Sequence, residues 1–130
     1  MDEMKKLIKE EITIAEKRLK AAKLLLKANM LEDAINRIYY SLYYAAKAML
    51  NSIGYDVKTH SGLISEFTLR LVKEGLVSKK YGKILRNAFE KRESSDYSIG
   101  AIFEKEEVEN LLNDAKEFLK RAKIFVKKNI

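Results

Sequence analysis

Apolar residues recur every three or four positions along almost the whole chain, which is the spacing of an amphipathic α-helix. No stretch alternates apolar and polar residues convincingly, as a β-strand would. The pattern predicts four long helices and one shorter helix, over residues 3–27, 31–52, 63–75, 78–93 and 104–127. We therefore expect an all-α fold, an antiparallel up-and-down four-helix bundle with one additional short helix.

Residues suited to turns stand between these helices. Asn29, Gly54 and Gly75 follow the first three apolar stripes, and Thr59 or Ser61 can cap the start of the third helix. The two longer connectors are residues 55–62 and 94–103. No linker or internal repeat interrupts the pattern, so residues 1–130 are predicted to form a single domain.

Composition narrows the classes of function. The chain has no cysteine, which excludes disulfides, thiolate catalysis and cysteine-based zinc sites. It also has no proline, so the commonest helix breaker is absent. No apolar run is long enough to cross a bilayer, and the charged start is unlike a signal peptide. A cytoplasmic protein that does not interact with membranes is the expectation.

The net charge of +7, from 26 Lys and Arg against 19 Asp and Glu, permits attraction to nucleic acid or to phosphate ligands. A second explanation is open as well. The chain is rich in Lys, Glu and Ile and contains no Gln, a composition common in thermophile proteins with ion-pair networks on their surface. The charge alone therefore does not identify a ligand.

The second predicted helix carries a polar stripe beside its apolar one. Residues at i, i+3, i+7 and i+10 share one narrow arc of this helix, namely Arg37, Tyr40, Tyr44 and Lys47. Cations and aromatic rings together can grip phosphates and stack on bases, which would make the stripe a nucleotide- or RNA-binding surface. The same residue types are typical of a dimer interface. Tyrosines can also pack inside a bundle with their hydroxyls bonded to polar neighbours, so three environments remain open.

The single histidine stands in the segment Lys58-Thr59-His60-Ser61-Gly62, where the third helix begins. The His60 imidazole could act as an acid or a base near neutral pH, and Lys58 beside it could contact a phosphate. His60 could equally bond backbone groups and fix the turn. One histidine cannot make a histidine-rich metal site, and no carboxylate cluster has ligand spacing, so we expect neither a metal nor another cofactor.

The end of the fourth predicted helix gathers further polar residues, which are Arg86, Lys91, Arg92, Ser94, Ser95, Asp96 and Tyr97. The planar fork of an arginine is well suited to hold a phosphate, and the hydroxyl groups add donors. The alternative is ordinary helix termination. Lys91 and Arg92 would then lie at the negative end of the helix dipole, and Asp96 would begin a turn.

Taken in order, these features resemble the HEPN family. The tyrosine-rich second helix of HEPN domains is similar to AINRIYYSLYYAA at residues 34–46. The connector and third helix of one small stand-alone branch resemble KTHSGL at residues 58–63, followed by Phe67. The ending of that branch's fourth helix resembles RESSDY at residues 92–97. The resemblance spans residues 12–125, and three motifs in this order are more specific than any one of them.

The resemblance implies a helical bundle that forms a homodimer and places the arginine motifs of two subunits at one cleft. Many members are metal-independent endoribonucleases that act as toxins, and their genes are often paired with a minimal nucleotidyltransferase that acts as the antitoxin. Their hallmark is an arginine and a later histidine, with four to six residues between them. Here Arg92 matches the arginine, whereas Tyr97 stands where the shortest form of the motif has its histidine.

This departure leaves the chemistry open. Cleavage by the 2′-hydroxyl of RNA needs a proton acceptor, a proton donor and a group that stabilises the charged phosphorane, and Arg92 could supply the last. A tyrosine hydroxyl ionises only near pH ~10, so Tyr97 would be a proton donor and a poor base. Asp96 beside Arg92 would be a weak base. His60 could take part if the fold, or a partner subunit, brings it near Arg92.

Three hypotheses follow. The first is a HEPN module that binds RNA or a nucleotide and partners a nucleotidyltransferase, without the histidine of the nucleases. The second is a metal-independent endoribonuclease toxin that uses Arg92 with Tyr97, Asp96 or His60. The third is a purely structural or interaction bundle.

Overall fold

The computed structural model of the chain describes residues 2–97 and 102–130. Over these ranges the protein is all-helical, which confirms the predicted fold class. The elements in order are α1 (Asp2–Lys27), α2 (Leu31–Ser52), α3 (His60–Phe67), the π-helical segment η1 (Thr68–Val72), α4 (Lys79–Tyr97) and α5 (Lys105–Asn129). None of the helices in the described ranges is long and apolar enough to cross a membrane.

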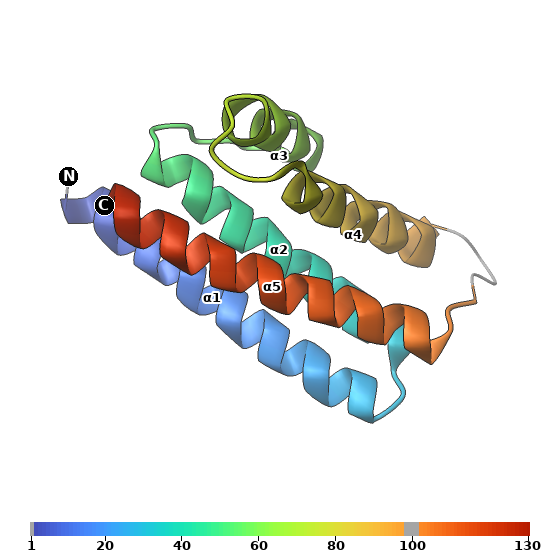
Figure 1. Cartoon of the computed structure of the whole chain (residues 1–130). Helices are drawn as coiled ribbons and strands as arrows, with labels where there is room; N and C mark the ends of the chain where they lie inside the picture. The colour runs from blue at the N-terminus through green and yellow to red at the C-terminus, as the bar shows by residue number, and fades with distance from the viewer. Residues whose placement is uncertain (1, 98–101) are drawn as a thin grey trace.

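Helix α2 is the centre of the molecule. It packs against α1 and α5 along one side and against α3 and α4 on the other. Figure 1 shows α1, α2 and α5 running side by side, with α3 and α4 above them. Because neighbours surround it, α2 buries residues on most of its circumference, including Ile35, Ile38, Tyr39 and Leu42. Burial of each such side chain stabilises the fold by about 1.5–3 kcal/mol.

The helix ends follow from local chemistry. Asn29, Gly54 and Gly75 have φ values of 60°, 91° and 75°, in the left-handed region that ends helices, as their residue types predicted. The choice between two candidate caps of α3 is settled by a hydrogen bond. The backbone N–H of Gly62 donates to Oγ1 of Thr59 at 3.0 Å, so α3 begins at His60, within the predicted connector 55–62.

The predicted end of α4 was wrong. The helix continues past Glu93 to Tyr97, so the connector begins four residues later than expected; Gly100 lies outside the described residues. An ion pair between Arg92 and Asp96, four residues apart on one face, supports the added turn. Consequently Asp96 does not open a turn, and it points along the same helix face as Arg92.

Candidate functional site

Six side chains from three helices gather on the side of α2 that faces α3 and α4. This group, the His60–Arg92 cluster, consists of Tyr39, Tyr40 and Tyr43 of α2, His60 of α3, and Phe89 and Arg92 of α4. The tyrosines lie within one turn of α2, and Phe89 and Arg92 lie one turn apart on α4. His60 is the first residue of α3, so the Thr59 cap fixes its position.

His60 is joined to the fully buried Tyr39. The Tyr39 hydroxyl and Nδ1 of His60 are 2.6 Å apart and share a hydrogen bond. The imidazole also packs on Tyr43, with ring centroids 4.6 Å apart, and meets Tyr40 edge-on. Burial raises the pKa of Tyr39 far above its ordinary value, although the Arg92 charge opposes this, so the hydroxyl stays protonated at neutral pH.

The imidazole is held in its neutral form. Burial lowers the pKa of His60, the nearby positive charge of Arg92 lowers it further, and Glu93 partly opposes both. A neutral imidazole has two tautomers. When Nδ1 accepts from the Tyr39 hydroxyl, Nε2 carries the proton and is a donor. When Nδ1 donates to Tyr39, Nε2 has a free lone pair and can act as a base.

Arg92 also packs on Tyr39. Its guanidinium carbon is 4.8 Å from the centre of the Tyr39 ring, 5.8 Å from that of Tyr40 and 5.9 Å from that of Phe89, within the range of cation–π attraction. Only 11% of its side chain is exposed. Nε is buried and has no acceptor among the described residues. The cluster therefore holds a largely desolvated cation.

The acidic partners of this cation are close but loosely bound. Arg92 donates to Glu93 at 3.4 Å and to Asp96 at 3.3 Å, the long end of the hydrogen-bond range. Both carboxylates come from α4 itself, and Asp96 is exposed. A phosphodiester offers two non-bridging oxygens, which an arginine can hold in bidentate geometry in place of such contacts. The arrangement can therefore bind an anion beside a neutral imidazole.

Comparison with known proteins places the chain in a family. The family model described as HEPN domain matches residues 8–125. The chain belongs to the HEPN family. This confirms the resemblance that the three sequence motifs indicated.

Several relatives of this HEPN protein match it over most of both chains. A UPF0332 protein of Thermotoga maritima is 40% identical over 119 residues, which cover 92% of this chain and 90% of the relative. A Methanocaldococcus jannaschii protein named "Putative toxin MJ0605" is 37% identical over 89% of each chain. A UPF0332 protein of Archaeoglobus fulgidus is 36% identical over 99% of each chain.

The HEPN fold brings four of the candidate residues together. His60, Arg92 and Tyr40 belong to the cluster, and Asp96 is bonded to Arg92. His60 could take part in the chemistry only if it lay near Arg92, and the fold of a single subunit brings the two residues together. Tyr44 is half-buried at the edge, with its ring 5.2 Å from that of Tyr43. The side chain of Tyr97 lies outside the described residues.

The remaining candidates lie elsewhere. Arg37 is exposed and donates to Asn36 at 3.3 Å. Lys58 is exposed and pairs with Asp56 at 2.9 Å. The hydrogen bond from Lys58 is the main cause of the lowered pKa of the Asp56 carboxyl, and the charge of Lys47 contributes to it. The stripe along α2 is thus divided, because only its tyrosines approach the cluster. The last candidate, Arg86, lines a separate hollow on α4.

Four residues of the site were not among the predicted site residues. Tyr39, Tyr43 and Phe89 lie within predicted helices, and Glu93 was the predicted last residue of the fourth helix. A signal for the α4 residues was available, because positions 89, 92, 93 and 96 share one helix face once the helix is extended. For Tyr39 no local signal distinguishes a core residue from one that bonds a distant imidazole.

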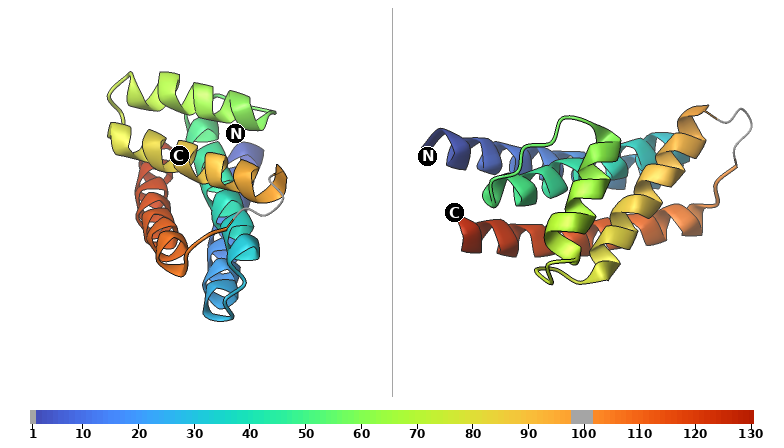
Figure 2. Two further views of the ribbon diagram at one scale, coloured as in Figure 1. Left: turned by 90° about the vertical axis from the view of Figure 1, so that its right-hand side faces the viewer. Right: turned by 90° about the horizontal axis from the view of Figure 1, so that it is seen from above.

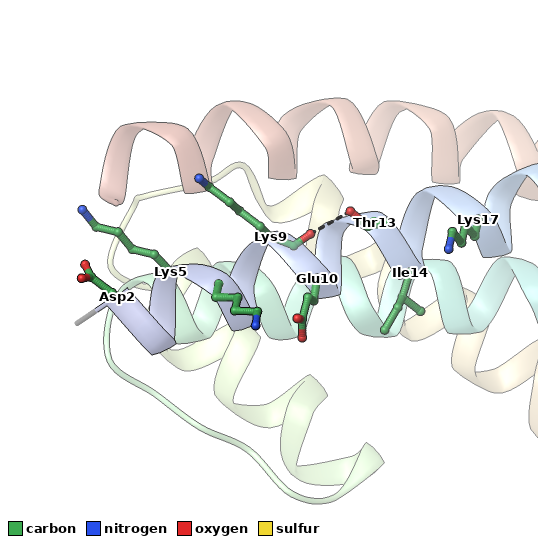
Figure 3. Close-up of a pocket in the computed structure, with 8 residues that line it drawn as sticks. Asp2, Lys5, Lys9, Glu10, Thr13, Ile14 and Lys17 are labelled. Carbon is green, nitrogen blue, oxygen red and sulfur yellow. Dashed lines mark hydrogen bonds between the residues drawn. The ribbon is translucent and has the colours of Figure 1, made fainter.

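A larger hollow, of about 730 Å³, runs along the outer face of α1 (Figure 3). Its lining mixes lysines with Asp2 and Glu10 and contains no aromatic ring or histidine. It therefore has the character of a solvated helix face. Among residues 2–97 and 102–130, no three His, Asp or Glu side chains gather closely enough to hold a metal ion.

Proposed function

We propose that this HEPN protein binds the phosphate backbone of RNA at the His60–Arg92 cluster. The proposal includes a toxin-type role, as one half of a pair with a minimal nucleotidyltransferase. One observation carries it, namely that three helices bring an imidazole and a desolvated arginine into contact with one buried tyrosine. Two relatives from Methanocaldococcus jannaschii are named putative toxins, and the second of these is 33% identical over 98% of this chain.

The physical case for phosphate rests on the state of both groups. A cation that is mostly removed from water interacts more strongly with an incoming anion than an exposed one does. Arg92 is in this state, and its hydrogen bonds to Glu93 and Asp96, at 3.4 and 3.3 Å, are near the upper end of the distance range. The neutral His60 adds an Nε2–H donor in one tautomer, and the half-buried Tyr40 and Tyr43 offer rings for a base to stack on.

A second candidate function is metal-independent cleavage of the bound RNA, and the lowered pKa of His60 favours it. With Nδ1–H donating to Tyr39, Nε2 can take the proton of a 2′-hydroxyl. The 2′-oxygen then bonds to phosphorus, the bond to the 5′-oxygen breaks, and that oxygen takes a proton from solvent. Arg92 would stabilise the charged phosphorane. The products would be a cyclic 2′,3′-phosphate and a 5′-hydroxyl.

Incubation with end-labelled single-stranded RNA in EDTA tests both functions, with binding and cleavage measured on the same samples. We expect Arg92→Ala to weaken binding at least tenfold, because it removes the desolvated cation. Arg18→Ala, on helix α1, which contributes no residue to the cluster, is the matched control and should bind like the parent. Equal binding by the Arg92 variant and the parent would overturn the proposal.

His60→Gln separates the two functions. If the protein cleaves RNA, this variant should bind it within a few-fold of the parent and lose cleavage, because glutamine cannot act as a base. If the parent binds RNA and cuts nothing, the binding function stands without the second candidate. Cleavage that persists in the His60 variant would exclude the imidazole as the base.

A further inference from the structure

A second basic feature lies on the outer side of α4, where η1 packs against it. This hollow, the basic groove, has a volume of about 200 Å³ and is lined by Thr68, Val72, Lys79, Gly82, Lys83 and Arg86. Figure 2 shows α3 and α4 side by side, joined by the turn that follows η1. The groove lies near that turn. The His60–Arg92 cluster lies toward the other end of the same pair of helices.

The three cations of the groove have no acidic partner. Lys79, Lys83 and Arg86 are exposed at i, i+4 and i+7 of α4, and none lies within 4.0 Å of a carboxylate among the described residues. On the face of α4 toward α5, by contrast, lysines are paired with carboxylates of α5. There Lys80 pairs with Glu117, and Lys91 pairs with Glu107 at 2.6 Å. Charge pairing thus separates a neutralised face of α4 from a row of unpaired cations over 79–86, which ends at the exposed Glu90 one turn further on.

The row of cations is unfavourable for the helix itself. Like charges four residues apart repel, and cations near the start of α4 face the positive end of its dipole. The first turn of α4 contains no acidic residue that would relieve this. A row of anions in the groove would relieve both effects. Gly82 adds no side chain to the floor, where a Cβ would be in ordinary contact with Cγ2 of Val72, and Thr68 adds a hydroxyl donor.

We infer that the basic groove binds the backbone of the same RNA strand that the His60–Arg92 cluster holds, at phosphates flanking the one at Arg92. The inference rests on the proposed function. From Lys83 to Arg92 the helix rises by about 14 Å, so a dinucleotide at the cluster does not reach the groove, whereas a longer strand does. A line of lysine and arginine beside a hydroxyl is a set of phosphate contacts that position a strand without reading its bases.

Fluorescence anisotropy with two labelled RNAs, a dinucleotide and a single strand of about twelve nucleotides, tests the inference. The groove variant carries Lys79→Glu, Lys83→Glu and Arg86→Glu. The control variant carries Lys5→Glu, Lys9→Glu and Lys17→Glu on the outer face of α1 (Figure 3), and lowers the net charge by the same amount. Circular dichroism establishes that both variants keep the helical content of the parent.

The groove variant should bind the longer strand at least tenfold more weakly and leave the affinity for the dinucleotide within about twofold. The slope of log affinity against log salt should fall in magnitude by about 2, since three phosphate contacts are lost. The control variant should bind both RNAs like the parent, within about twofold.

Four results would overturn the inference. They are an unchanged affinity of the groove variant for the longer strand, an equal loss in the control variant, a similar loss for the dinucleotide, and polyglutamate that binds the groove as tightly as RNA. Tight binding of polyglutamate would indicate that the groove binds an acidic protein surface. If the groove variant binds like the parent and Arg92→Ala weakens binding, only the inference fails. If the parent binds neither RNA, the proposed function fails as well.

Discussion

Replacing Tyr39 by phenylalanine tests whether the His60–Arg92 cluster is a built site. The substitution keeps the buried ring under Arg92 and removes only the hydroxyl that bonds Nδ1 of His60 at 2.6 Å. A hydrogen bond of this kind contributes about 1 kcal/mol net, and no cavity of consequence forms because the rings match. Since His60 is only half-buried, water can bond the freed Nδ1, which keeps the cost near this value.

The free energy of unfolding is measured by urea denaturation, with circular dichroism as the probe. We expect Tyr39→Phe to lower it by about 1 kcal/mol, or the melting temperature by about 3–5 °C for a chain of this size. Tyr43→Phe is the matched control. It removes a hydroxyl from the same cluster that bonds no other described residue, so its cost should stay within about 0.5 kcal/mol. Equal stability of Tyr39→Phe and the parent, or equal costs for the two variants, would refute the reasoning.

Three further predictions concern titration, the core and assembly. The imidazole of His60, followed by NMR, should titrate below pH 6.5, and Arg92→Ala should raise its pKa while Arg92→Lys does not. The contribution of His60 to the free energy of unfolding is therefore complete above pH 6.5, and it is lost as the pH falls from there through the lowered pKa. Glu11→Gln should raise the free energy of unfolding at pH 7 by about 1 kcal/mol, because burial raises the pKa of this carboxyl and an amide can donate to the unpartnered Oδ1 of Asn51. This gain in stability should vanish below pH 4.5, and a loss of stability at pH 7 would refute the prediction. Light scattering at micromolar concentration should give twice the chain mass of 15.0 kDa, and a monomer mass would contradict the proposed homodimer.

The sequence predicted the helices well because their cause is local. Periodic apolar residues, the residues with positive φ at Asn29, Gly54 and Gly75, and a threonine cap each act within a few positions. The prediction failed at the end of α4 for a local reason too. Two serines and an aspartate suggested a turn, whereas the ion pair of Arg92 with Asp96 supports the helix through them.

The site was predicted only in part because its residues are brought together by tertiary packing and not by local sequence. Arg92 and His60 could each be singled out by residue type and by the family resemblance. Their meeting at Tyr39 depends on how α3 and α4 dock on α2, which the spacing of apolar residues does not determine. Tyr39 itself is fully buried and reads as core until the position of His60 is known.

One measurement tests most directly whether His60 and Arg92 bind the same RNA phosphate. The imidazole signals of the single histidine are followed by NMR while an RNA dinucleotide with a blocked 2′-hydroxyl is added in EDTA. We predict a saturable shift in the parent that disappears in Arg92→Ala and persists in Arg18→Ala. An imidazole signal that stays unchanged at saturating dinucleotide, or that shifts equally in the Arg92 variant, would contradict the account.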